Sequence, residues 1–169
     1  MSGQGVSAGV KGFTDNEAEE KRRIPKREKV SDVERKEDVN AERKVAQIMQ
    51  EFPRTLPNAL DTVMKEYHIQ EKDLAEESDI DEKTIKRIRN VMEYKPKLPT
   101  MIQLCIGLRV PTIICLALID VSGYRLRFYG VELAYYYIIT QKIGCTLEAC
   151  NKYLKDLGYP QLGENYQAA

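Results

Sequence analysis

The stretch at residues 69–90 reads IQEKDLAEESDIDEKTIKRIRN and predicts two short helices joined by a tight turn. Apolar residues recur through it at the spacing that folds two helices against each other and onto a third. One further apolar residue follows a turn later and extends the pattern. The apolar positions are Leu74, Ala75, Ile80, Ile85, Ile88 and Met92.

Asp81 is the predicted start of the second helix, because its carboxylate can accept hydrogen bonds from the free N–H groups of the first turn. Ile80, just before this cap, and Ile85, at the fourth helical position, have the spacing of a hydrophobic staple. The cap therefore fixes where the helix begins, and the staple fixes the angle at which the chain enters it.

The opposite face of the second helix is basic and polar. Arginine and lysine can bond guanine edges, asparagine can bond adenine edges, and surplus positive charge meets phosphate. An ordinary solvated helix face has a similar composition, so the face alone leaves both interpretations open. Its members follow the i, i+3, i+4, i+7 spacing and are Lys83, Lys86, Arg87 and Asn90.

The stretch resembles the helix-turn-helix of the phage-repressor and Cro (lambda-repressor-like) family. Asp79 stands where that family usually has glycine, and aspartate tolerates the left-handed backbone better than most residues. Glu71 stands where the family usually has glutamine, a position that faces DNA phosphate. The pattern continues downstream to about Gly123. The matching positions are Leu74, Ala75, Ile80, Thr84, Ile85 and Ile88.

The resemblance implies a sequence-specific protein that binds double-stranded DNA, of the kind that regulates transcription in bacteria and phages. The recognition helix would span residues 81–90, approximately. Its first turn enters the major groove deepest in this motif. The residues expected to read bases are Lys83, Thr84, Arg87 and Asn90, and those expected mainly to hold phosphate are Lys86, Arg89 and Lys95.

The rest of the chain predicts an all-α fold. A five-helix repressor-like helix-turn-helix domain is expected at residues 54–123, followed by a C-terminal antiparallel helical hairpin at residues 124–169. Residues 1–12 are rich in glycine and residues 13–38 are dense in charges of both signs, so residues 1–38 are expected to be a disordered tail or linker. Residues 39–53 predict an amphipathic helix that must dock on the following domain, a second copy or a partner.

Apolar residues at helical spacing indicate which helix faces form the hydrophobic core. The run at residues 113–119 is almost wholly apolar, which predicts a central helix. The two hairpin helices each carry one apolar stripe, and Tyr136 and Tyr137 project beside the first. The hairpin is therefore a candidate surface for a homodimer or for a protein partner. Its stripes are Val131, Ala134, Tyr135, Ile138 and Ile139, then Leu147, Cys150, Leu154 and Leu157.

Composition limits the possible functions. The chain has 26 basic and 26 acidic side chains, so bulk positive charge does not drive binding to nucleic acid. The single histidine, His68, and the absence of a Gly-rich phosphate loop or paired acids argue against an enzyme, and no cofactor is implied. The four cysteines are expected to be reduced, buried and free of metal. They are Cys105, Cys115, Cys145 and Cys150.

The apolar run at 113–119 is far shorter than the roughly 18 residues of a membrane helix, and residues 1–12 lack the apolar core of a secretory signal. The expected location is therefore the cytoplasm, without membrane association.

A second function stays open. Residues 70–79 contain one lysine against five acidic side chains, whereas residues 80–90 contain four basic against two acidic. So much acid beside the recognition helix weakens phosphate contacts. The alternative is a non-enzymatic protein-interaction or regulatory module that keeps the helix-turn-helix fold, either antitoxin-like or the C-terminal part of a larger protein.

Overall fold

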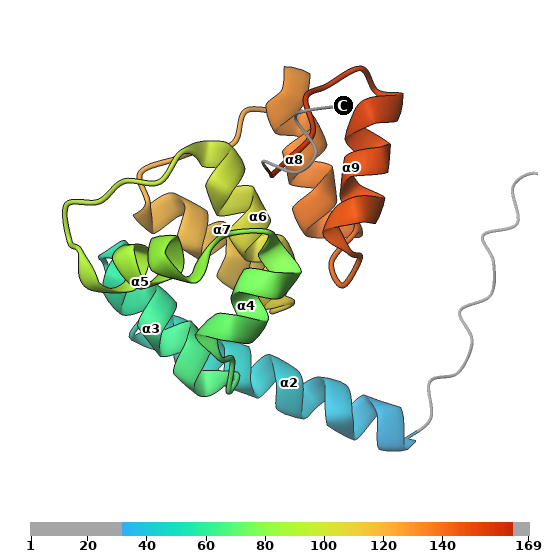
Figure 1. Ribbon diagram of the computed structural model, residues 1–169. Helices are drawn as coiled ribbons and strands as arrows, with labels where there is room; N and C mark the ends of the chain where they lie inside the picture. The colour runs from blue at the N-terminus through green and yellow to red at the C-terminus, as the bar shows by residue number, and fades with distance from the viewer. Residues whose placement is uncertain (1–31, 164–169) are drawn as a thin grey trace, which may run out of the picture. The chain divides into compact units, whose positions relative to one another are not determined.

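The computed structural model describes residues 32–163, whose regular secondary structure is entirely helical (Figure 1). This confirms the predicted all-α class. The chain divides into two units, residues 1–39 and 40–169. The helices are α2 (Asp32–Gln50), α3 (Leu56–Glu66), α4 (Glu71–Ser78), α5 (Glu82–Asn90), α6 (Leu98–Leu108), α7 (Thr112–Val121), α8 (Gly130–Gln141) and α9 (Leu147–Asp156).

The predicted N-terminal disorder is only partly open to comparison. Residues 32–38 were expected in the disordered segment but form the beginning of α2. The remainder of that expectation, residues 1–31, lies outside the described residues.

The C-terminal half of α2 docks on the helical domain. Ile48 is buried, and Val45, Met49 and Phe52 pack against the common core. The Lys44 ammonium donates a 2.6 Å hydrogen bond to the Glu66 carbonyl and lies 4.4 Å from the centre of the Tyr67 ring. The stripe thus contacts the domain that follows, which is one of its three predicted docking partners.

The centre of the domain is α6. Every residue from Met101 to Leu108 is buried, and α6 packs against α4, α7, α8 and α9. The prediction that residues 113–119 form the central helix is wrong in this respect. α7 buries one face through Ile114, Cys115, Leu118 and Ile119, while Ile113 is 52% exposed. An apolar composition does not by itself reveal which helix is enclosed on all sides.

Close contact between α6 and α4 holds the turn after α4 in place. The Gln103 amide donates hydrogen bonds to the Ser78 carbonyl at 3.0 Å and to the Asp79 carbonyl at 3.4 Å. Gly107 has no side chain where the two helices meet, and a Cβ there would lie 2.7 Å from the Ser78 Cβ. The buried amide and the glycine thus fix α4 and its turn on the central helix.

Helices α8 and α9 each pack on α6, and their buried side chains join the same hydrophobic cluster as the rest of the domain. Most of the two predicted stripes is buried, but Val131 is only partly buried and Leu157 is 49% exposed because α9 ends at Asp156. Asn151 exchanges two hydrogen bonds with the backbone of Leu162, at 2.7 and 2.8 Å. None of the described helices is long and apolar enough to cross a membrane.

Candidate nucleic-acid interface

The turn between α4 and α5 has the backbone that its sequence predicts. Asp79 adopts the left-handed conformation, with φ 53° and ψ 36°. Ile80 is buried, and Asp81 caps α5. The Asp81 carboxylate accepts a 2.9 Å hydrogen bond from the Thr84 amide and a 2.6 Å hydrogen bond from the Thr84 hydroxyl. The start of α5 is therefore fixed by its own first turn.

The inner face of α5 is held by Ile85 and Ile88, both fully buried. Met92, predicted on the same face, is instead 59% exposed. The cause is the helix end: α5 stops at Asn90, and Val91 has extended dihedrals of φ −108° and ψ 106°. Helical periodicity therefore no longer applies at Met92.

The outer face presents Lys83, Arg87 and Asn90, all exposed. The Arg87 guanidinium carbon lies 4.2 Å from the centre of the Tyr94 ring. The Asn90 side chain donates a 2.8 Å hydrogen bond to the Lys86 carbonyl, which leaves its amide oxygen free to accept. Three of the four residues predicted to read bases thus share one accessible face. The fourth, Thr84, donates a hydrogen bond from its hydroxyl to the Asp81 carboxylate.

Arg89 points away from that face and joins three helices. Its guanidinium donates one hydrogen bond to Glu71 of α4, at 2.6 Å, and another to Asp61 of α3. These two carboxylates raise the pKa of Arg89, with the Asp61 hydrogen bond as the largest cause. In this arrangement the charge of Arg89 is compensated inside the fold, and Glu71 contacts a cation where the family pattern had placed it against phosphate.

The predicted phosphate contacts Lys86 and Lys95 also have protein neighbours. The Lys86 ammonium lies 3.8 Å from a carboxylate oxygen of Glu71 and 3.8 Å from one of Glu82. The Lys95 ammonium lies 4.9 Å from the centre of the Tyr124 ring. Both lysines remain exposed, so these contacts reduce their positive field without removing them from solvent.

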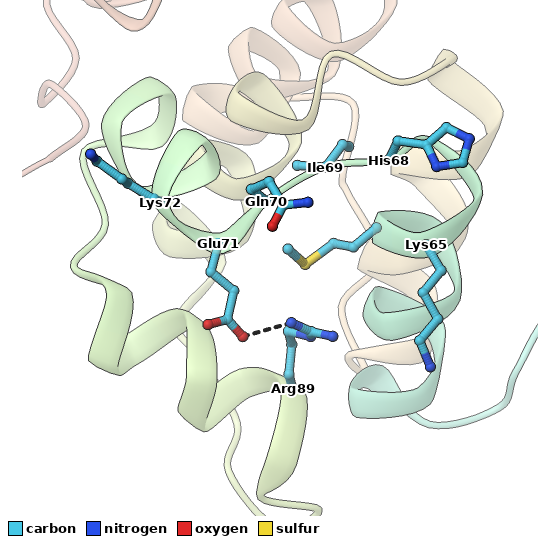
Figure 2. A pocket seen from close by; sticks show the side chains of 8 residues that line it. Lys65, His68, Ile69, Gln70, Glu71, Lys72 and Arg89 are labelled. Atoms are coloured by element: carbon cyan, nitrogen blue, oxygen red, sulfur yellow. Dashed lines mark hydrogen bonds and ion pairs between the residues drawn. The ribbon is translucent and has the colours of Figure 1, made fainter.

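A cleft of about 580 Å³ lies beside this network, between the end of α3 and the start of α4. Figure 2 shows Glu71 and Arg89 pointing toward each other at its floor, while Lys65, His68 and Lys72 point outward. Its lining has three basic side chains, Lys65, Lys72 and Arg89, against one acidic side chain, Glu71, and Arg89 is already bonded to Glu71 and Asp61. Among the described residues, no group of three or more His, Cys, Asp or Glu side chains is arranged to hold a metal ion.

The cysteines carry free thiols. Cys105, Cys115 and Cys150 are buried, as predicted, and Cys145 is partly buried. Burial raises the pKa of the Cys150 thiol to about 11, which keeps it protonated at neutral pH.

Sequence reasoning missed two partners at this surface. Asp61 lies 28 residues before Arg89, and no local spacing connects them. Tyr94 lies beyond the end of α5, where helical periodicity does not apply. The contact between Tyr94 and Arg87 could have been suspected from the residue types, because a tyrosine next to a basic helix is a common partner of arginine.

We predict that Asp81→Asn leaves stability near neutral pH almost unchanged and flattens its loss in acid. Hydrogen bonds from the Thr84 hydroxyl, then from the Thr84 amide, hold the pKa of the Asp81 carboxyl below its ordinary value of 3.8. Its contribution is therefore complete above pH 3.8 and disappears as the pH falls through the lower folded-state pKa. Asparagine caps about as well and does not titrate.

The measurement is urea unfolding at neutral pH and at several values down to about pH 2. Asp81→Ala is the control and should lose about 1 kcal/mol at neutral pH through loss of the cap. An Asp81→Asn variant that loses stability in acid as steeply as the wild type would contradict this account.

Comparisons of the chain with protein-family models, with curated proteins and with solved structures yield no match.

Proposed function

We propose that this chain is a sequence-specific DNA-binding protein of the repressor-like helix-turn-helix type, a regulator of transcription in which α5 enters the major groove. The observation that carries the proposal is the division of α5 into two faces. Ile85 and Ile88 are fully buried, the Asp81 cap fixes the start, and Lys83, Arg87 and Asn90 stand exposed in a row. A rigid helix with exposed donors is the element that reads base edges.

In the proposed complex, the predicted site residues divide their roles. Lys83, Arg87 and Asn90 contact bases, and Thr84 contributes mainly by holding the Asp81 cap. Lys86 and Lys95 contact phosphate from their exposed positions. Arg89, engaged with Asp61 and Glu71, orients α5 on the other two helices.

Because acidic side chains surround α5, we expect the affinity for DNA to depend only modestly on salt concentration. The two exposed lysines assigned to phosphate, Lys86 and Lys95, imply a slope of about −2 in log affinity against log salt.

The test is a fluorescence-anisotropy titration against genomic duplex fragments, at salt from about 50 to about 200 mM. The double variant Lys83→Ala/Arg87→Ala should lose at least tenfold in affinity, because each lost base contact costs about 1–3 kcal/mol. The control is Lys152→Ala/Lys155→Ala, which removes the same charge from exposed positions of α9. Equal losses in the two double variants, or a wild-type slope near zero, would overturn the proposal.

A second candidate function, a protein-interaction module, is favoured by exposed aromatic side chains on α8 and in the loop before it. Phe128 is 71% exposed, Tyr129 64% and Tyr137 46%. The Phe128 ring packs edge-on against Tyr136, with 5.3 Å between the ring centres. This surface would bind a partner protein or a second copy of the chain, and it becomes the better account if the titration gives no salt-dependent binding.

A further inference from the structure

We propose that Tyr94 is a specificity-determining residue: its ring positions the Arg87 guanidinium to read one guanine in the major groove. This inference rests on the proposed function. It adds a residue outside the recognition helix and names the base that Arg87 recognises.

The contact that carries the inference lies between the last turn of α5 and the loop that follows it. The Arg87 guanidinium carbon is 4.2 Å from the centre of the Tyr94 ring. At this separation the planar cation lies against the π face of the ring. Arg87 is exposed and Tyr94 is partly buried, so the ring is the fixed partner and the guanidinium is the group it orients.

The loop that carries Tyr94 is anchored at several points. The Tyr94 amide donates a 3.1 Å hydrogen bond to the Val91 carbonyl. Two residues further on, the carbonyl of buried Pro96 accepts a 3.0 Å hydrogen bond from the Tyr124 hydroxyl. The Tyr94 ring itself packs against the hydrophobic core. A platform held in this way fixes the direction of Arg87 before DNA arrives.

Stacking leaves the hydrogen-bonding capacity of Arg87 intact. The ring covers one face of the guanidinium, whereas the N–H donors lie in its plane and point outward. Guanine presents two acceptors, O6 and N7, in the major groove, and arginine bonds both with a planar pair of donors. Among the described residues, no hydrogen bond or ion pair occupies the Arg87 donors.

The other cations of α5 are less suited to this task. Arg89 has donors bonded to Asp61 and Glu71. Lys86 lies between two carboxylates. Lys83 is exposed, but its ammonium is a point charge without a planar pair of donors. Arg87 is therefore the side chain whose geometry favours guanine, and Tyr94 is the residue that maintains that geometry.

The experiment begins with selection of binding sites from a random duplex library by the wild-type protein. The guanine whose enrichment disappears in Arg87→Ala is then replaced by 7-deazaguanine, which removes the N7 acceptor and keeps base pairing. The ratio of the affinity for the guanine duplex to the affinity for the 7-deazaguanine duplex measures how strongly Arg87 reads this base. Tyr94→Leu should reduce the ratio about fivefold to tenfold, because the cation is no longer oriented. Tyr94→Phe should keep the ratio, because the ring and not the hydroxyl makes the contact.

Matched controls separate this effect from general loss of structure. Tyr153→Leu removes another ring that stacks on a cation, Lys142 at 4.7 Å, in the C-terminal part of the domain and should leave the ratio unchanged. Far-UV circular dichroism and thermal melting check each variant. If Tyr94→Leu does not fold, Tyr94→Met takes its place, since its flexible side chain refills the gap without a ring.

The outcomes distinguish this inference from the proposed function. If the wild type enriches no sequence, the proposed function fails and this inference fails with it. If the wild type selects a site and Tyr94→Leu keeps the wild-type ratio, the proposed function stands and this inference is overturned. A Tyr94→Phe variant that loses the ratio as fully as Tyr94→Leu also overturns it.

Discussion

Replacing Arg89 with methionine should lower the free energy of unfolding by about 3 kcal/mol, whereas the same replacement at Arg87 should change it by less than about 1 kcal/mol. The two arginines lie on the same helix, but their surroundings differ. The Arg89 side chain is 22% exposed and bonds Asp61 and Glu71, whose side chains are 33% and 22% exposed. Removing the cation leaves two partly buried carboxylates beside each other, with only the more exposed Lys65, 2.6 Å from Asp61, and Lys86, 3.8 Å from Glu71, as counter-charges.

Urea denaturation of both variants at neutral pH measures this difference. Glu71→Gln, alone and combined with Arg89→Met, completes a double-mutant cycle and isolates the coupling between these two side chains. We expect the combined loss to be smaller than the sum of the single losses, because each single change already breaks the 2.6 Å hydrogen bond. Equal effects of the Arg89 and Arg87 replacements would show that the network does not hold α5 in place.

Gly107→Ala should destabilise the protein by about 2 kcal/mol, although alanine favours helices by about 1 kcal/mol over glycine. A Cβ at position 107 would lie 2.7 Å from the Ser78 Cβ and 3.1 Å from the Ser78 amide nitrogen. These atoms belong to or adjoin the α4 backbone, so they cannot move without α4. The added methyl group therefore pushes α4 away from α6.

Ser78→Gly provides the matched test of that contact, because it removes the atom that the new methyl group meets. Alone it should destabilise, since it adds a helical glycine and loses the hydrogen bond from the Ser78 hydroxyl to the Leu74 carbonyl. Combined with Gly107→Ala, it should recover part of the loss. Strict additivity of the two changes in urea denaturation would rule out the proposed steric contact between α4 and α6.

Local signals allowed much of the fold to be predicted from the sequence. Asp81 begins α5 because its side chain accepts a hydrogen bond from the first turn of that helix. The left-handed Asp79 follows from the tolerance of aspartate for that backbone. Such features depend on residues a few positions apart, which is the range that spacing can report.

The errors share two physical causes. The prediction that Met92 and Leu157 lie on buried stripes is wrong, because each lies just beyond a helix end, where the periodicity of the stripe stops. The central helix was misidentified because burial depends on how many neighbours surround a helix. Two residues of α6 indicate its central position. The buried Gln103 amide donates a hydrogen bond to the Ser78 carbonyl, and Gly107 lets α4 pack closely against α6.

The sequence predicts which side chains α5 exposes at the candidate site, but not which side chains of other helices contact them. The exposed positions of Lys83, Arg87 and Asn90 follow from helical spacing. The Asp61–Arg89 pair could not be predicted, because it joins residues that only the packing of α3 against α5 brings together. Charge that looked available for phosphate in the sequence is thus partly used to assemble the three helices.

The most direct test of the central claim is a titration of ¹⁵N-labelled protein with duplex DNA from the selected sites, followed by backbone amide chemical shifts. If α5 reads the major groove, the largest shifts should fall at residues 82–90 and at Tyr94 and Lys95, with smaller changes at the start of α4. Shifts confined to residues 124–163, or no shifts at saturating DNA, would contradict the account.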